Sequence, residues 1–172
     1  MPTSIQHIAS IVAPDASIIR TAHIEHLLTD SRKLVFPETS LFFALNTLSQ
    51  NGHSYIKELS QKGVYNFVVN KQFDKSGYNN INFLVVDHVI DALQLIAKDH
   101  RAQFNYPVIG ITGSNGKTIV KEWLAQLLSQ QYHVVRSPRS YNSQIGVPLS
   151  VWEMSNQYNL GIFEAGISKK GE

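Results

Sequence analysis

The chain contains no cysteine among its 172 residues. It therefore has neither a disulfide framework nor a thiolate metal site or nucleophile. No apolar run approaches the roughly 20 residues that a membrane-spanning helix needs. The amino terminus also lacks a basic flank followed by a long apolar segment, so no secretory signal is visible. We expect no membrane partner, and the lack of cysteine favours a cytoplasmic location.

A strong charge of one sign is also lacking, because 15 Lys and Arg nearly balance 13 Asp and Glu for a net charge of +2. The basic residues are scattered, so we expect no nucleic-acid partner. The seven histidines show no recurring metal-ligand spacing beyond the pair His23 and His26. A hydrophobic content of 43% is enough for a core, in one large domain or two small ones.

The most informative stretch is the glycine-containing segment Gly113–Thr118. The apolar run Val108–Thr112 precedes it, and apolar residues recur after it at the spacing of one helical face. A strand therefore leads into a glycine turn that opens a helix. The apolar residues of that helix are Ile119, Val120, Trp123, Leu124, Leu127 and Leu128.

This layout is typical of a phosphate-binding loop. Backbone N–H groups of the turn and the positive end of the helix converge on an anion, Lys117 can reach the outer phosphates, and the Thr118 hydroxyl can bind Mg²⁺. Ile111 stands where the longer motif has a glycine, and a plain glycine turn with a solvated lysine is the alternative. We predict a nucleotide site formed by Gly113, Ser114, Asn115, Gly116, Lys117 and Thr118.

The residues before 101 indicate a compact α/β unit. A short helix from Ile5 and a small helix stopped by Gly63 are predicted from apolar spacing and from the glycine. Four apolar or β-rich runs read as strands, and a longer helix ends near His100. The strands are predicted at 24–28, 41–45, 65–69 and 82–86, and the longer helix at 89–100.

A connector at 101–107 leads to a second unit in which strands and helices alternate, which predicts a parallel sheet. The strands are predicted at 108–112, 133–136 and 160–164, and the helices at 118–130 and 148–154. Three strands are few for a nucleotide-binding sheet. We therefore expect Glu172 to end a fragment and the P-loop domain to be incomplete.

Three stretches together resemble the Mur ligases, the ATP-dependent amide-forming enzymes of peptidoglycan synthesis. They are Thr112–Thr118, Tyr141–Leu149 and Ile162–Gly166. Upstream, Thr29–Arg32 and the run Leu41–Leu45, followed by Asn51-Gly52-His53, resemble the amino-terminal domain of the same family. The resemblance spans nearly the whole chain in the right order.

The run that begins at Asn142 is most similar to the member that adds D-alanyl-D-alanine to UDP-MurNAc-tripeptide, in the version fused to an alanine racemase. Asn46-Thr47 and Ser143 depart from residues that are common in the family.

The resemblance implies an α/β fold with a small UDP-substrate-binding domain at 1–103 and the first part of a P-loop ATPase domain at 104–172. It implies ATP and Mg²⁺ as cofactors, an acyl-phosphate intermediate, and UDP-MurNAc-tripeptide and D-alanyl-D-alanine as partners. The implied roles are catalysis for Lys117, metal binding for Thr118 and Glu164, and substrate binding for Ser31, Arg32 and Asn142.

Several of these residues also have plainer interpretations. Glu164 ends an apolar strand, where a carboxylate is as often a solvated end or an acceptor for loop amides. The segment Asp30–Arg32 also suits an Asx or Ser turn with an exposed arginine, and His53 and Asn142 suit loop-holding roles. For the whole chain, the alternatives are another P-loop ligase, such as a folylpolyglutamate synthase, a small kinase, or a non-catalytic module that binds the UDP substrate.

Overall fold

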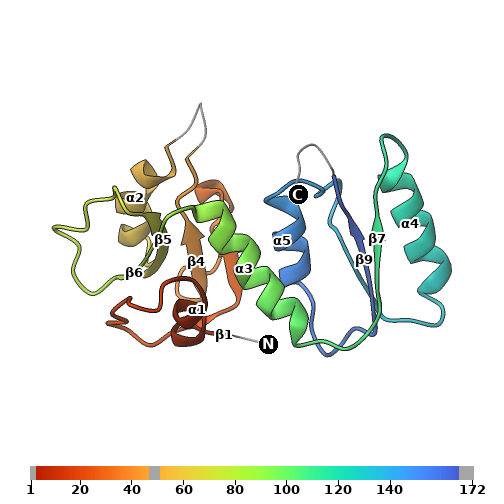
Figure 1. Cartoon of the computed structure of the whole chain (residues 1–172), viewed down its shortest axis with the longest axis horizontal. Coiled ribbons are helices and arrows are strands. Elements are labelled where there is room, and N and C mark those ends of the chain that lie inside the picture. The colour runs from red at the N-terminus through yellow and green to blue at the C-terminus, as the bar shows by residue number, and fades with distance from the viewer. Residues whose placement is uncertain (1–2, 47–50, 167–172) are drawn as a thin grey trace. The chain divides into compact units, whose positions relative to one another are not determined.

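The computed structural model describes residues 3–46 and 51–166. The chain forms two compact units, Met1–Ile96 and Ala97–Glu172, which we call the amino-terminal and the carboxyl-terminal unit. Helix α3 (Val89–Ala102) runs from the first into the second (Figure 1). Two positions raised by the sequence, the departure at Thr47 and the expected fragment end at Glu172, lie outside the described residues.

A four-stranded parallel sheet forms the centre of the amino-terminal unit. Its strands lie in the spatial order β3 (His26–Leu28), β4 (Ser40–Phe43), β5 (Asn66–Asn70) and β6 (Asn82–Val86). Its central strands are almost continuous apolar runs, which suits a parallel sheet covered on both faces. Phe42, Phe67 and Val69 are at most 1% exposed. The predicted α/β class is confirmed.

Residues that favour helix ends mark the start of one helix of this unit and the end of another. Helix α1 (Ile5–Val12) starts after Ser4, whose hydroxyl accepts a hydrogen bond from the His7 N–H at 3.1 Å. Helix α2 (Ile56–Gln61) follows the 3₁₀ turn η2 (Gly52–Tyr55). It ends before Gly63, whose φ of 91° is readily adopted only by glycine, as the sequence predicted.

The strand predicted at 24–28 is divided in the structure. β2 (His23–Ile24) pairs antiparallel with β1 (Thr3–Ser4), while β3 (His26–Leu28) joins the parallel sheet. The backbone N–H groups of Glu25 and His26 both donate to the Thr39 carbonyl, at 2.9 and 3.2 Å. Two successive donors to one acceptor break the ladder at Glu25, and an apolar run gives no sign of such a break.

The carboxyl-terminal unit is built on a three-stranded parallel sheet in the order β7-β9-β8. The strands are β7 (Val108–Ile111), β8 (Val134–Arg136) and β9 (Leu160–Glu164), and the helices are α4 (Lys117–Leu128) and α5 (Gly146–Trp152). All five elements occur where the sequence predicted them, with ends shifted by at most two residues. Strands and helices alternate along the chain, and both strand pairs are parallel. The expected parallel sheet is therefore confirmed.

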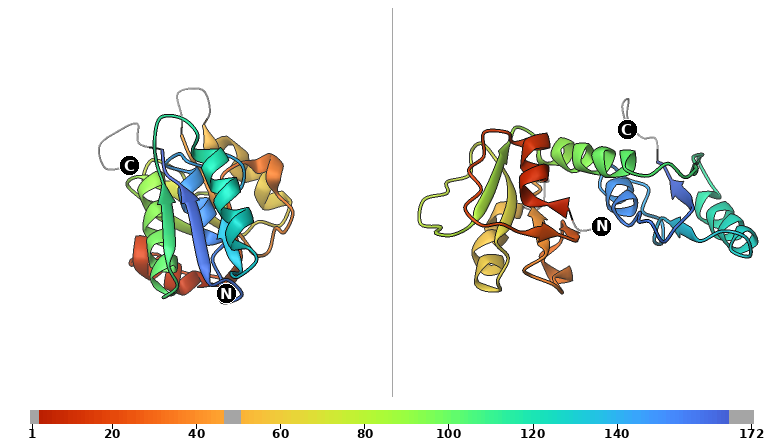
Figure 2. Two further views of the ribbon diagram at one scale, coloured as in Figure 1. Left: turned by 90° about the vertical axis from the view of Figure 1, so that its right-hand side faces the viewer. Right: turned by 90° about the horizontal axis from the view of Figure 1, so that it is seen from below.

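Alternate residues of β9 face different helices, and α4 and α5 lie on opposite faces of the sheet (Figures 1 and 2). Ile162 packs in a cluster with Ala125 and Leu128, whereas Phe163 packs with Met154 and Val151. Phe104 belongs to the second cluster and is 4% exposed. The connector predicted at 101–107 is therefore shorter than expected, because α3 continues through Ala102 and Phe104 is part of the core.

Candidate active site at the phosphate loop

The loop between β7 and α4 has the backbone of an anion-binding turn. Gly113 and Gly116 have φ values of 140° and 80°, in the region that residues with a side chain rarely adopt, and Gly116 is the N-cap residue directly before α4. Residues 113–116 are exposed. The first N–H groups of α4 have no partners within the helix, so they and the helix dipole favour an anion at this end.

Lys117 is the first residue of α4, and its side chain folds back over the loop. The ammonium donates to the Gly113 carbonyl at 2.5 Å. A cation at the positive end of a helix is unfavourable unless an anion accompanies it. The contact with Gly113 holds the ammonium beside the exposed loop, where an incoming phosphate would meet it.

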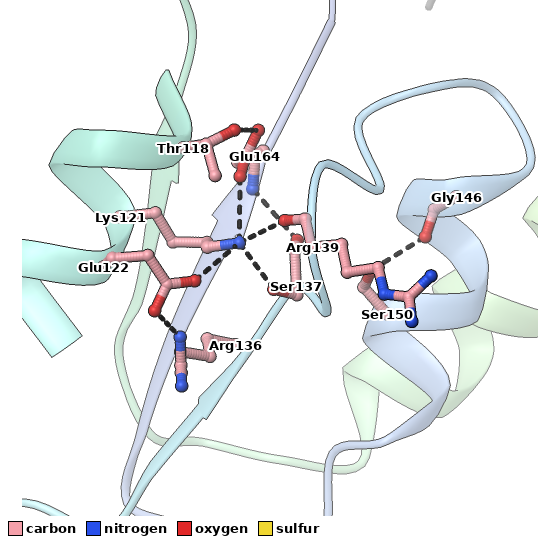
Figure 3. A network of polar contacts seen from close by, with 9 residues as sticks. All are labelled: Thr118, Lys121, Glu122, Arg136, Ser137, Arg139, Gly146, Ser150 and Glu164. Atoms are coloured by element: carbon pink, nitrogen blue, oxygen red, sulfur yellow. Dashed lines mark hydrogen bonds and ion pairs between the residues drawn. The ribbon is translucent and has the colours of Figure 1, made fainter. Parts of the chain in front are cut away.

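Glu164 lies at the carboxyl end of β9, directly opposite Ile111 of β7. Its side chain is fully buried. The Thr118 hydroxyl donates to Glu164 Oε2 at 3.1 Å, and the Ser137 hydroxyl accepts from the Glu164 N–H at 3.1 Å (Figure 3). The structure thus brings the two predicted metal ligands, Thr118 and Glu164, into direct contact from different elements.

These two oxygens fit a hard divalent cation such as Mg²⁺. Glu164 Oε1 has no hydrogen-bond partner among the described residues, although the Lys121 ammonium lies 2.9 Å from it. No group of three or more His, Cys, Asp or Glu residues gathers in the part of the chain that the structure describes. One carboxylate and one hydroxyl leave the other positions to phosphate and water, which is the usual arrangement for Mg²⁺.

Asn142 lies next to the end of β9. Its carbonyl accepts from the Gly166 N–H at 2.7 Å, and a side chain at Gly166 would come within 2.6 Å of that oxygen. The neighbouring Ser143 stands where an asparagine is common in the family that the sequence resembles. Its hydroxyl accepts a hydrogen bond from the Gly146 N–H at 3.1 Å, at the start of α5. The two segments Tyr141–Leu149 and Ile162–Gly166 therefore contact each other in this unit.

In the amino-terminal unit, Asp30 and Arg32 form an ion pair within a turn that follows β3. Arg32 Nε and Nη2 donate to the two carboxylate oxygens of Asp30 at 2.9 and 2.8 Å, and the Arg32 N–H donates as well. These hydrogen bonds, chiefly that of the guanidinium, lower the pKa of Asp30 to about 2. The expected Asx turn is present, and Ser31 opens the 3₁₀ turn η1 (Ser31–Lys33).

His53 joins the segment after β4 to the end of β5. Its Nε2 accepts from the Asn70 N–H at 3.3 Å, and its Nδ1 lies 3.2 Å from both Asn46 Oδ1 and Asn51 Oδ1. The loop-holding interpretation of His53 therefore has direct support. Since the strands are parallel, the residues after β3, β4 and β5 share one edge of the sheet, the edge at which open α/β sheets bind ligands.

Comparison with known proteins agrees with this geometry. Residues 111–172 match the family model of the Mur ligase middle domain. Over 149 residues the chain is 37% identical to a UDP-N-acetylmuramoyl-tripeptide–D-alanyl-D-alanine ligase of Synechocystis, covering 87% of this chain and 32% of the relative. The ligase of the same name from Bacillus subtilis is 34% identical over 149 residues. The chain belongs to the Mur ligase family.

Solved structures of the family share the fold. The chain aligns over its full length with MurF from Acinetobacter baumannii, with a TM-score of 0.86 and 26% identity, and covers 37% of that protein. It also aligns, with a TM-score of 0.72, with MurF ligase from Thermotoga maritima in complex with ADP. The chain thus spans about a third of the length of these Mur ligases. No helix among the described residues is long and apolar enough to cross a membrane.

Sequence reasoning missed two residues that the structure places beside Glu164 in this candidate site, Lys121 and Ser137. Lys121 was overlooked because lysine is expected on a solvated helix face. The available signal was its position, four residues before Ala125 on the stripe of α4 that packs against the sheet. Ser137 follows a short strand in a polar loop, and nothing in its surroundings distinguishes it.

A second buried titratable residue of this unit, His100, offers a test of the core beneath the site. Its side chain is 2% exposed, and its Nε2 donates to the Met154 carbonyl at 3.0 Å. The centroid of its ring lies 4.5 Å from the centroid of the Trp152 ring. Nδ1 has no hydrogen-bond partner among the described residues. Burial lowers the pKa of His100 below its ordinary value, because the charged imidazolium is less favourable away from water.

We expect the NMR titration of His100 to give a pKa below about 6.5. Because the unfolded chain then binds more protons, the stability contributed by neutral His100 is complete above about pH 6.5 and is lost as the pH falls towards the folded-state pKa. The resonance is assigned by its absence from a His100→Gln variant. A pKa at or above 6.5 would show that the imidazolium is accommodated in the folded core.

Proposed function

We propose that the chain is part of an ATP-dependent ligase that adds D-alanyl-D-alanine to UDP-MurNAc-tripeptide in peptidoglycan precursor synthesis. The observation that carries this proposal is the contact between Thr118, at the start of the phosphate-loop helix, and the buried carboxylate of Glu164. The names of the Synechocystis and Bacillus subtilis relatives support the reaction and its substrates. The ADP complex of the Thermotoga maritima relative supports the use of ATP.

Each part of the chain has a separate role in this proposal. Residues 1–103 bind the UDP end of the substrate, with Ser31 and Arg32 at the sheet edge after β3. Residues 104–172 form the first part of the ATPase domain, in which Gly113–Thr118 holds the phosphates of ATP. Asn142 contacts substrate beside the end of β9. We expect this reaction in the cytoplasm, where ATP and the UDP-linked substrate are available. The fused racemase stays a prediction from the resemblance.

Thr118 and Glu164 would hold Mg²⁺, which when bound neutralises negative charge on the phosphates. The chain's own residues position the nucleotide and stabilise charge. Backbone N–H groups around Gly113 and Gly116 donate to phosphate oxygens, and the Lys117 ammonium leaves the Gly113 carbonyl for the phosphoryl oxygens, where charge develops during transfer. The substrate carboxylate takes the γ-phosphoryl group of ATP, the bond to the β-phosphate oxygen breaks, and ADP is released. The amine of the dipeptide then attacks the acyl carbon, and inorganic phosphate leaves.

A folylpolyglutamate synthase would use the same phosphate loop. The amino-terminal unit favours the peptidoglycan substrate instead, because its polar segments after β3, β4 and β5 share one sheet edge. The planar guanidinium of Arg32 can donate two parallel hydrogen bonds to a diphosphate. To do so it would give up its two hydrogen bonds to the Asp30 carboxylate.

The function is tested in a chimaera that joins residues 1–172 to the remaining two thirds of the Synechocystis relative. With ATP and Mg²⁺ we expect ligation of D-alanyl-D-alanine to UDP-MurNAc-tripeptide, measured by mass spectrometry of the product and by release of phosphate. Folate with glutamate serves as the competing pair of substrates. Product from that pair, with none from the peptidoglycan pair, would contradict the proposal.

A further inference from the structure

Lys121 is a fully buried lysine, with an exposed fraction of 0%. Complete burial of an ammonium is rare unless it is paired and hydrogen bonded, because removing it from water is costly. Lys121 meets both conditions. It donates to the Ser137 carbonyl at 2.8 Å and to the Arg139 carbonyl, and it lies 2.9 Å from Glu164 Oε1. Figure 3 shows its nitrogen at the centre of this network.

The two oxygens of Glu164 have different neighbours. Oε1 faces the Lys121 ammonium, whereas Oε2 accepts from the Thr118 hydroxyl at 3.1 Å. Lys121 and Thr118 lie on consecutive turns of one face of α4, since they are three residues apart. The helix that carries the phosphate loop thus contacts both oxygens of the carboxylate, and rotation of the carboxylate would break one contact or the other.

Without Lys121, Glu164 would be a buried carboxylate with one hydroxyl donor. An unpaired buried charge is strongly unfavourable, so the group would take up a proton or turn away from its position. Glu122 is also within 3.2 Å of Lys121, but its side chain is 43% exposed and it pairs with Arg136. Glu164 is therefore the only fully buried carboxylate near the ammonium among the described residues.

We propose that Lys121 is a positioning residue that holds the ionised carboxylate of Glu164 by Oε1 and so directs Oε2, together with the Thr118 hydroxyl, towards the divalent cation of the nucleotide. This inference rests on the proposed function, because it takes Glu164 and Thr118 as the cation ligands. Through the carbonyls of Ser137 and Arg139, the same ammonium fixes the loop after β8 against β9. Partners that orient a metal ligand commonly contribute 10- to 100-fold to metal affinity.

The test measures ADP binding to the 172-residue chain by calorimetry, with and without Mg²⁺. The ratio of the two affinities is the gain due to the metal. We expect Lys121→Met to reduce this gain at least about tenfold. Metal-free ADP binding should stay within about twofold, because the Lys121 ammonium contacts Ser137, Arg139, Glu122 and Glu164 and not the loop at 113–116. Glu164→Gln should reduce the gain similarly. A role confined to stability would not change the ratio in a folded variant.

Ser150→Ala is the matched control. Ser150 is also fully buried in this unit, but its hydroxyl donates to the Gly146 carbonyl at 2.8 Å and not to the Glu164 network. The control should retain the metal-dependent gain. If Lys121→Met does not fold, the double variant Lys121→Met/Glu164→Gln decides, since it leaves no unpaired buried charge. The proposal expects the double variant to be more stable than Lys121→Met, with a higher melting temperature.

The outcomes separate the two proposals. If the wild-type chain gains no ADP affinity from Mg²⁺, the proposed cation site fails and this inference fails with it. If Glu164→Gln loses the gain while folded Lys121→Met keeps it, only the role of Lys121 is refuted. A double variant no more stable than Lys121→Met would likewise refute it, because Lys121 would then act through the backbone carbonyls alone.

Discussion

Replacing Lys117 with alanine is expected to lower kcat of the ligase chimaera by roughly 10²- to 10³-fold, the usual loss when one group that stabilises transition-state charge is removed. The melting temperature should change little. The Lys117 ammonium donates to the Gly113 carbonyl at an exposed loop. We therefore expect its contribution to folding to be small, and we propose that its charge acts on the phosphoryl group in the transition state.

Lys62→Ala is the matched control for this substitution. Lys62 is exposed and pairs with Glu58 within the amino-terminal unit, so its removal should leave kcat unchanged. Steady-state phosphate release gives kcat and KM, and circular dichroism gives the melting temperature. A Lys117→Ala variant with normal kcat and a lowered melting temperature would mean that Lys117 serves the fold and not the reaction.

Replacing Gly52 with alanine should produce the largest loss of stability in the amino-terminal unit. A Cβ at this position would lie 2.6 Å from the carbonyl carbon of Ala44 and 2.6 Å from the nitrogen and oxygen of Leu45. These are backbone atoms of the segment after β4, and a rotamer change cannot move them away. Overpacking of a buried site lowers the free energy of unfolding by about 1 to 3 kcal/mol. Because backbone atoms cannot move aside as side chains do, we expect a loss of about 3 kcal/mol or more here.

Urea unfolding followed by circular dichroism measures this loss. Gly110→Ala is a suitable control, because its Cβ would meet no atom within 4 Å. We expect the control to unfold near the wild-type urea concentration. A Gly52→Ala chain of undiminished stability would show that the segment around Leu45 can move away from η2, and the sheet edge next to His53 would then be less fixed than the structure indicates.

The sequence predicted the elements whose formation depends on local pattern. Strand β6 (Asn82–Val86) has the bounds that its β-rich run indicated, and α4 follows from apolar spacing after a glycine turn. The resemblance to the family implied that Thr118 and Glu164 both bind metal, but their direct contact could not be predicted from spacing, because 46 residues separate them. Parallel pairing of β7 with β9 brings them together, and pairing is a property of the whole sheet.

The elements that the sequence did not reveal depend on tertiary context. The break at Glu25 arises because Thr39, from another segment, accepts two backbone donors. Lys121 became part of the site because the sheet and the loop after β8 enclose it, so a residue type typical of surfaces is completely buried. His100 similarly gives no sign in the sequence that Met154 and Trp152 surround it.

We propose that one chain carries a UDP-substrate site in its amino-terminal unit and a nucleotide site at its phosphate loop. The most direct test of this proposal is an amide NMR titration of the ¹⁵N-labelled chain with UDP-MurNAc-tripeptide and, separately, with ADP and Mg²⁺. We expect the UDP compound to shift Asp30–Lys33 and Gly52–His53, and Arg32→Ala to weaken its binding by about 1 to 2 kcal/mol. ADP and Mg²⁺ should shift Gly113–Thr118 and Glu164. Shifts from the UDP compound confined to Gly113–Thr118, with the residues after β3 and β4 unchanged, would contradict the account.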